Sequence, residues 1–207
     1  MDTELSYYER ASRNFFARRW HQNIATLVRR LMPQGYESMK HLDVGCGDGF
    51  TIRMIRPQGA ITGVDTDSIM LRHAKARGIK IVNADIRNLS MFDDHSFDLI
   101  TCLDVLEHVE HPTLALAETY RVLKKRGFFI LTTPNVNLSF RLIWWMWTRV
   151  GMGKFWQTCP HVHVYNLWNS TETGLSLVER FRDVGFKPER TTLTNWNMIA
   201  GIRAIKL

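Results

Sequence analysis

The sequence predicts an α/β protein in which helices cover both faces of a mainly parallel β-sheet. Short apolar runs alternate with segments of helical pattern through residues 36–135, and a repeated strand–helix–strand order indicates parallel strands in one sheet. Five runs are too short for helices and are rich in β-branched or aromatic residues: His41–Val44, Ala60–Val64, Ile79–Val82, Asp98–Cys102 and Gly127–Thr132. Continuous apolar runs of this kind are typical of strands that are buried on both faces.

The segments between and after these runs carry residues that are typical of helix ends. Three helices are expected: from Asp67 to Gly78, from about Pro112 to near Gly127, and over Glu172–Val184 before Gly185. Two strand-like runs follow, around Glu189–Thr194 and Met198–Lys206. They are close enough in sequence to pair as an antiparallel finish to the sheet.

Length and composition are those of one globular domain over residues 1–207. The chain has 207 residues, of which 45% are hydrophobic and 23% charged. Its three cysteines, Cys46, Cys102 and Cys159, are far apart and predict neither a disulfide framework nor a CxxC metal cluster. The acidic start and the lack of an apolar stretch of about 20 residues predict a cytoplasmic protein that does not span a membrane.

The net charge of +7 (27 basic minus 20 acidic residues) lies in the flanks of the chain. Residues 1–40 hold seven basic and four acidic groups, residues 41–135 eleven and twelve, and residues 136–207 nine and four. A basic surface attracts anionic partners such as phosphate, nucleic acid or acidic lipid head groups. Simple solubility explains the charge equally well.

A glycine-rich motif follows the first expected strand and reads Leu-Asp-Val-Gly-Cys-Gly-Asp-Gly over residues 42–49. Gly45, Gly47 and Gly49 permit positive φ and let the backbone approach a ligand, so we expect a bound small molecule there. The spacing is G-x-G-x-G rather than the dinucleotide G-x-G-x-x-G, and Asp43 beside the loop disfavours a pyrophosphate. The alternative is a plain strand-to-helix turn.

Two more acids follow the next two strands. Asp65 ends the second strand, where a carboxylate can accept hydrogen bonds from both hydroxyls of a ribose. Asp85 follows the third strand and is placed to accept from an adenine amino group, with Ile86 packed against the ring. Three acids at three successive strand ends favour a nucleoside without phosphates.

These segments, with Phe97–His108 and Arg121–Gly127, resemble class I S-adenosylmethionine-dependent methyltransferases in order and spacing. The resemblance implies a Rossmann-like seven-stranded sheet whose last strand is antiparallel, and S-adenosyl-L-methionine as the cofactor, with S-adenosyl-L-homocysteine (SAH) as its product. Arg126-Gly127 stands where the family usually has Pro-Gly. The cofactor-binding residues that it implies are Asp43, Gly45, Cys46, Gly47, Gly49, Asp65, Thr66, Asp85, Ile86 and Leu103.

Within this class the chain looks most like the ubiquinone-biosynthesis O-methyltransferases. The features that carry this likeness are Leu-Glu-His at 106–108, Thr-Pro-Asn at 133–135 and a later histidine before Gly185. We therefore expect methyl transfer to an oxygen of a small or lipid-like acceptor. An RNA methyltransferase and a non-catalytic S-adenosylmethionine-binding protein are the alternatives. A nucleic acid partner is less favoured, because the chain has no recognisable RNA-binding appendage.

Candidate catalytic residues follow the fourth strand. Asp104, Glu107 and His108 are spaced i, i+3 and i+4, so a helix starting here would place them on one face. His108 is the expected general base, since an unperturbed imidazole titrates near neutrality. In one alternative His108 packs against the helix and Glu107 is solvated. In another, all three bind Mg²⁺ or Mn²⁺ together with His161 or His163.

The two flanks of the core are rich in apolar and basic residues. Residues 1–35 show helical spacing and predict a cap over the core of residues 36–135, and residues 171–207 hold the final helix and strand pair. Residues 136–170 form an expected lid. It holds five tryptophans and three basic residues: Trp144, Trp145, Trp147, Trp156, Trp168, Arg141, Arg149 and Lys154. This composition suits a buried lid, a pocket for an apolar acceptor or peripheral contact with an anionic membrane.

Overall fold

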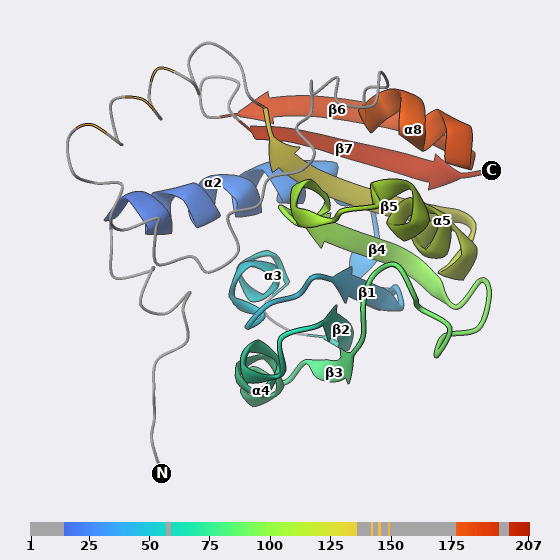
Figure 1. Ribbon diagram of the computed structural model, residues 1–207, viewed down its shortest axis with the longest axis horizontal. Coiled ribbons are helices and arrows are strands. Elements are labelled where there is room, and N and C mark those ends of the chain that lie inside the picture. Colours follow the sequence, from blue (N-terminus) through green and yellow to red (C-terminus); the bar gives the residue numbers. More distant parts are fainter. Residues whose placement is uncertain are drawn as a thin grey trace.

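Seven strands form one sheet in the order β3-β2-β1-β4-β5-β7-β6 (Figure 1). The computed structural model describes residues 15–56, 59–135, 142, 145, 149, 177–194 and 199–207. The strands are β1 His41–Val44, β2 Ile61–Asp65, β3 Lys80–Asn83, β4 Phe97–Leu103, β5 Leu123–Pro134, β6 Phe186–Thr194 and β7 Ile199–Lys206. β1 to β5 pair in parallel, and β7 is antiparallel to both β5 and β6. The predicted seven-stranded sheet with an antiparallel last strand is confirmed.

The described helices are α2 Phe15–Leu31, α3 Phe50–Ile55, α4 Ser68–Ala76, α5 Pro112–Val122 and α8 Leu177–Val184, with 3₁₀ turns at Tyr36–Ser38 (η1) and Leu106–His108 (η2). Asp67 caps α4 as predicted, because its Oδ1 accepts from the backbone N–H groups of Ile69 at 2.8 Å and Met70 at 3.1 Å. The predicted start of the last helix, at Glu172, lies outside the described residues.

The boundary between α5 and β5 differs from the prediction. The helix ends at Val122, five residues before the expected glycine, and Leu123 already pairs with Phe97 of β4. The strand then bends before it resumes its pairing at Phe128, and Arg126 takes a left-handed φ of 62° in this bend. Strand pairing therefore overrides the local helical pattern over residues 123–126.

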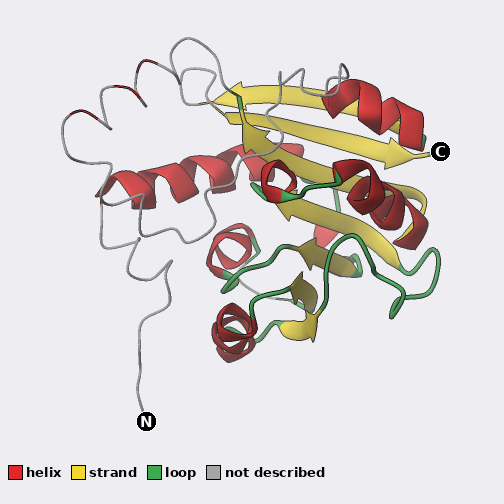
Figure 2. Ribbon diagram, in the orientation of Figure 1, coloured by secondary structure: helices red, strands yellow, loops and turns green. Residues whose placement is uncertain are grey.

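Helices cover both faces of the sheet, as predicted (Figure 2). On β5, Phe129 and Leu131 belong to the hydrophobic cluster on one face and Ile130 to the cluster on the other. The first cluster includes Leu116 of α5 and Phe181 of α8. The second includes Leu27 of α2, Ile52 of α3 and Leu71 of α4. Packing on both faces fixes the carboxyl ends of β1, β2 and β4 at one edge of the sheet.

Candidate active site

The glycine loop joins β1 to α3 at the carboxyl end of the sheet. It is pinned to β2, because the backbone N–H groups of Gly45 and Cys46 donate to the Val64 carbonyl at 2.7 Å and 3.0 Å. Gly45 has a φ of 70°, and a Cβ there would lie 2.3 Å from Val105 Cγ2. The tight, left-handed path of this loop therefore requires glycine at its first position.

Asp65, at the end of β2, is held by the backbone around it. Its Oδ2 accepts from the Gly47 N–H at 2.8 Å, and its Oδ1 accepts from the Asp67 N–H at 3.0 Å. A carboxylate has about four acceptor positions, so both oxygens keep capacity for a further donor. The side chain is half-buried and fixed in direction beside the loop, which suits a diol such as that of a ribose.

Asp85, after β3, has a partner that the sequence analysis did not predict. Arg87 binds its carboxylate with two nitrogens, and the shortest contact, Arg87 Nη2 to Asp85 Oδ2, is 2.6 Å. This hydrogen bonding holds the pKa of Asp85 below its usual value. An adenine amino group at Asp85 would share the carboxylate with Arg87. Ile86 beside it is 7% exposed, and Thr66 is exposed.

Asp43 lies beneath the loop and is almost fully buried. Thr101 of β4 donates its hydroxyl to Asp43 Oδ1 at 2.5 Å. Burial raises the pKa of Asp43 to about 7, against the lowering effect of the Thr101 hydrogen bond. Its charge therefore changes in the physiological pH range.

Asp104 stands at the end of β4 and is oriented from two sides. The Thr132 hydroxyl of β5 donates to its Oδ1 at 2.7 Å, and the indole Nε1–H of Trp20 donates to its Oδ2 at 3.4 Å. Burial raises the pKa of Asp104, while these two hydrogen bonds and the charge of His108 lower it. Sequence reasoning missed Trp20 and Thr132, whose partnership with Asp104 depends on the tertiary fold.

Asp104, Glu107 and His108 do not share one helical face. Asp104 has a left-handed φ of 55°, and only residues 106–108 form a short 3₁₀ turn. Glu107 is 1% exposed, so the alternative in which it is solvated is wrong. Burial raises its pKa well above the usual value, and its Oε2 has no hydrogen-bond partner in the described residues. His108 is exposed at the rim.

A metal site is not formed by the part of the chain that the structure describes, where no three His, Cys, Asp or Glu side chains are grouped to hold an ion. His161 and His163, which the metal hypothesis requires, lie outside that part.

Three described residues lie in residues 136–170, the expected lid, which we call the tryptophan-rich segment. Leu142 and Trp145 are 56% and 54% exposed, and the Arg149 guanidinium lies 5.3 Å from the centre of the Trp145 ring. The other four tryptophans, Arg141, Lys154 and residues 1–14 lie outside the described residues. Among the described helices, none has both the length and the apolar character needed to cross a bilayer.

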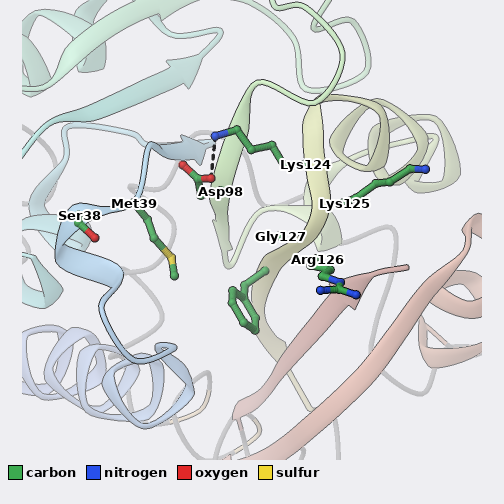
Figure 3. A pocket seen from close by; sticks show the side chains of 8 residues that line it. Ser38, Met39, Asp98, Lys124, Lys125, Arg126 and Gly127 are labelled. Carbon is green, nitrogen blue, oxygen red and sulfur yellow. Dashed lines mark hydrogen bonds and ion pairs between the residues drawn. The ribbon is translucent and has the colours of Figure 1, made fainter.

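A cavity of about 280 Å³ lies at the other end of the sheet, where β4 and β5 begin (Figure 3). Lys124, Lys125 and Arg126 line it, and Lys124 Nζ pairs with Asp98 Oδ1 at 2.7 Å. The cavity lies at the opposite end of β4 and β5 from the glycine loop, so it is separate from the candidate active site.

Comparison with known proteins finds similarity to one family. A family model described as a methyltransferase domain matches residues 42–131. Residues 42–131 are thus similar to a methyltransferase domain over a little less than half of the chain. The ubiquinone biosynthesis O-methyltransferase of Pasteurella multocida is 35% identical to the chain over 121 residues, which cover 51% of the chain and 50% of that protein. The chain spans about half the length of the curated relatives that it matches.

Solved structures share the fold of the chain. A SAM-dependent methyltransferase from Thermotoga maritima has a TM-score of 0.69 at 22% identity, covering 92% of this chain and 90% of that one. Magnesium protoporphyrin IX methyltransferase from Synechocystis PCC 6803, solved with bound SAH, has a TM-score of 0.65 at 16% identity, covering 100% and 90%. The resemblance to S-adenosylmethionine-dependent methyltransferases that the motifs predicted is confirmed.

Proposed function

We propose that the protein transfers the methyl group of S-adenosylmethionine to an oxygen of a small or lipid-like acceptor. The observation that carries this proposal is the Asp65 carboxylate, fixed by two backbone N–H groups beside a glycine loop that has no room for side chains at Gly45. That arrangement fits a nucleoside whose ribose meets Asp65 and whose other end meets the loop backbone. The names of the sequence relatives support oxygen as the acceptor atom.

The proposed cofactor contacts follow the order of the strand ends. The glycine loop and Asp43 would surround the methionine part, Asp65 would bind the ribose, and Asp85 would bind the adenine. The further contacts that we propose are Cys46, Thr66, Ile86 and Leu103. When bound, S-adenosylmethionine supplies an already activated methyl group, so the protein's main task is to hold the acceptor in line with it.

We propose His108 as the general base that takes the proton of the acceptor hydroxyl. It lies at the rim, and its charge acts on the Asp104 carboxyl. We propose that Asp104, which Thr132 orients, stabilises the imidazolium that forms when the proton is taken. Burial raises the pKa of Glu107 well above its usual value, and one of its oxygens has no partner in the described residues. We propose that this oxygen contacts the acceptor.

An apolar acceptor, or the membrane that carries it, is supported by the exposed pair Leu142 and Trp145. An exposed indole beside a cationic side chain combines apolar burial with attraction to anionic head groups. We propose that this surface makes peripheral contact with an anionic membrane or with the acceptor's apolar tail.

Methyl transfer from radiolabelled S-adenosylmethionine tests the function directly. Catechol and quinol acceptors with short and long alkyl tails, simple sugars and a structured RNA are offered in parallel. The proposal expects labelled product from the hydroxylated aromatic acceptors, with greater turnover for the apolar ones. Label in RNA alone would support the RNA alternative. Binding of SAH without transfer to any acceptor would support the non-catalytic alternative.

A further inference from the structure

A row of polar side chains crosses the interior beneath the glycine loop. Arg56, His41, Thr101 and Asp43 are 4%, 1%, 0% and 3% exposed, respectively. His41 and Asp43 lie two residues apart on β1 and therefore on the same face of the strand, and Thr101 of β4 is the partner of Asp43 across the sheet. Buried polar groups are stable only when they are hydrogen-bonded, so the contacts within this row matter.

Chemistry fixes the direction of the hydrogen bonds in this row. The Arg56 guanidinium can only donate, so Nδ1 of His41, 3.4 Å from Arg56 Nη1, is an acceptor. Burial lowers the pKa of His41 to about 3, so the ring is neutral and carries a single proton. Because Nδ1 is an acceptor, this proton is on Nε2. Nε2 lies 2.9 Å from the Thr101 hydroxyl oxygen and donates to it. The Thr101 proton is then directed to Asp43 Oδ1.

We infer that Arg56, His41 and Thr101 form a one-directional relay that favours the charged form of the Asp43 carboxylate and thereby sets the pH range in which the cofactor binds. This inference rests on the proposed function, because it takes Asp43 to face the cationic methionine end of the cofactor. Thr101 and His41 are positioning residues in this scheme: they act on the cofactor through Asp43. The positive charge of Arg56, at the far end of the row, orients the N–H dipole of His41 and the O–H dipole of Thr101 toward Asp43.

The groups around Asp43 mostly raise its pKa, so the hydrogen bond from Thr101 affects how much of Asp43 is charged. Burial raises the pKa of Asp43, the Thr101 hydrogen bond lowers it, and the nearby Asp65 carboxylate raises it. The charge of Asp43 also acts on the thiols of Cys46 on the loop and Cys102 on β4, and Asp48 on the loop acts on Cys46. Burial raises the pKa of both thiols, so they are neutral. Among the described residues, Thr101 is thus the side chain that favours a charged Asp43 by donating to it.

Two measurements on the full chain test the relay. ¹³C NMR of protein labelled at the aspartate carboxyl carbons gives the titration midpoint of Asp43 without cofactor, and Asp43→Asn assigns the signal. Calorimetry with SAH from pH 5.5 to 9 gives the pH dependence of affinity. Thr101→Val removes the donor at nearly constant shape, and Thr101→Ser restores it. Thr62→Val, on the adjacent strand β2, is the matched control, and His41→Leu breaks the relay one step further back. Thermal unfolding confirms that each variant is folded.

The relay predicts that Thr101→Val moves the Asp43 midpoint upward by about one pH unit or more, the expected effect of losing a hydrogen bond to a charged group. His41→Leu moves it in the same direction, and Thr101→Ser and Thr62→Val leave it near the wild-type value. SAH affinity should fall with decreasing pH, and the pH at which it falls should rise together with the Asp43 midpoint.

An unmoved midpoint in both Thr101→Val and His41→Leu would overturn the relay. A midpoint that moves while SAH affinity does not follow would overturn its role in cofactor binding. Absence of SAH binding by the wild-type protein would instead refute the proposed function, and the NMR result would still stand for the relay itself.

Discussion

Trp20 of α2 donates its indole N–H to the Asp104 carboxylate at 3.4 Å, although the two residues are 84 positions apart in sequence. The contact ties α2 to the end of β4, next to the glycine loop. A second contact supports it, since His21 Nδ1 lies 3.1 Å from the Thr51 hydroxyl of α3. The helix α2 thus covers one face of the sheet and also reaches the candidate active site.

Replacing Trp20 by Phe is expected to shift the acid limb of the pH–rate profile to higher pH. The substitution removes a hydrogen bond that lowers the pKa of Asp104, so this pKa rises further above its ordinary value. A protonated Asp104 cannot stabilise an imidazolium at His108, and the rate at a given acidic pH falls. Initial rates between pH 5.5 and 9 measure the shift. An acid limb that coincides with that of the wild type would show that Asp104 does not act in the reaction.

Gly45→Ala is expected to destabilise the protein and to weaken SAH binding at least tenfold. A methyl group there meets Val105 at 2.3 Å in addition to the strain of a φ of 70°. Gly35 is a matched control, because its φ is 71° and nothing lies within 4 Å of an added Cβ. Gly35→Ala should cost only about 1 kcal/mol of unfolding free energy, the typical cost of the left-handed conformation. Urea unfolding and calorimetry measure both effects. If Gly45→Ala and Gly35→Ala lost equal amounts of unfolding free energy and SAH affinity, close packing at the loop would not be the cause.

His108→Ala is expected to reduce turnover by roughly 10²- to 10⁴-fold while SAH affinity is retained, as for the loss of a general base. The same assay is repeated with EDTA, which should leave the wild-type rate unchanged. Loss of activity in EDTA and its return with Mg²⁺ or Mn²⁺ would support the metal hypothesis instead. Full activity of His108→Ala would leave positioning of the acceptor as the protein's contribution.

Trp145→Glu is expected to release the protein from anionic liposomes in low salt. The substitution replaces an exposed apolar ring with a charge that anionic head groups repel. Leu114→Glu is the control, because Leu114 on α5 is 55% exposed and outside the tryptophan-rich segment. Sedimentation with vesicles of phosphatidylcholine and phosphatidylserine measures binding. If the wild-type protein stays in the supernatant at every salt concentration, the membrane proposal is wrong.

The sheet was predictable because its signals are local. Apolar runs at β1 and β4, the cap at Asp67 and the glycine that ends α8 each depend on a few neighbouring residues. The end of α5 was not predictable from local signals, because Leu123 pairs with Phe97 of β4 instead of continuing the helix. Propensity is a weak guide where such pairing competes with it.

The candidate site was predictable in its residue types and less so in its geometry. The order of Asp43, Asp65 and Asp85 along the chain places all three at one edge of a parallel sheet. Their partners were not predicted: Arg87 lies only two residues after Asp85, and Thr101 reaches Asp43 across the strand pair. Asp104 has a left-handed backbone conformation, so it does not continue into a helix with Glu107 and His108. The spacing of the three residues does not predict this conformation.

Calorimetric titration of Asp65→Ala with SAH measures whether the Asp65 carboxylate binds the cofactor. Binding is expected to weaken by about 2–3 kcal/mol relative to the wild type, because two charge-assisted hydrogen bonds to the ribose are lost. Asp93→Ala, at an exposed aspartate away from the loop, should bind SAH as the wild type does. Thermal unfolding of each variant separates weaker binding from loss of folded protein. SAH affinity in folded Asp65→Ala equal to that of the wild type would contradict the assignment of this edge of the sheet as the cofactor site.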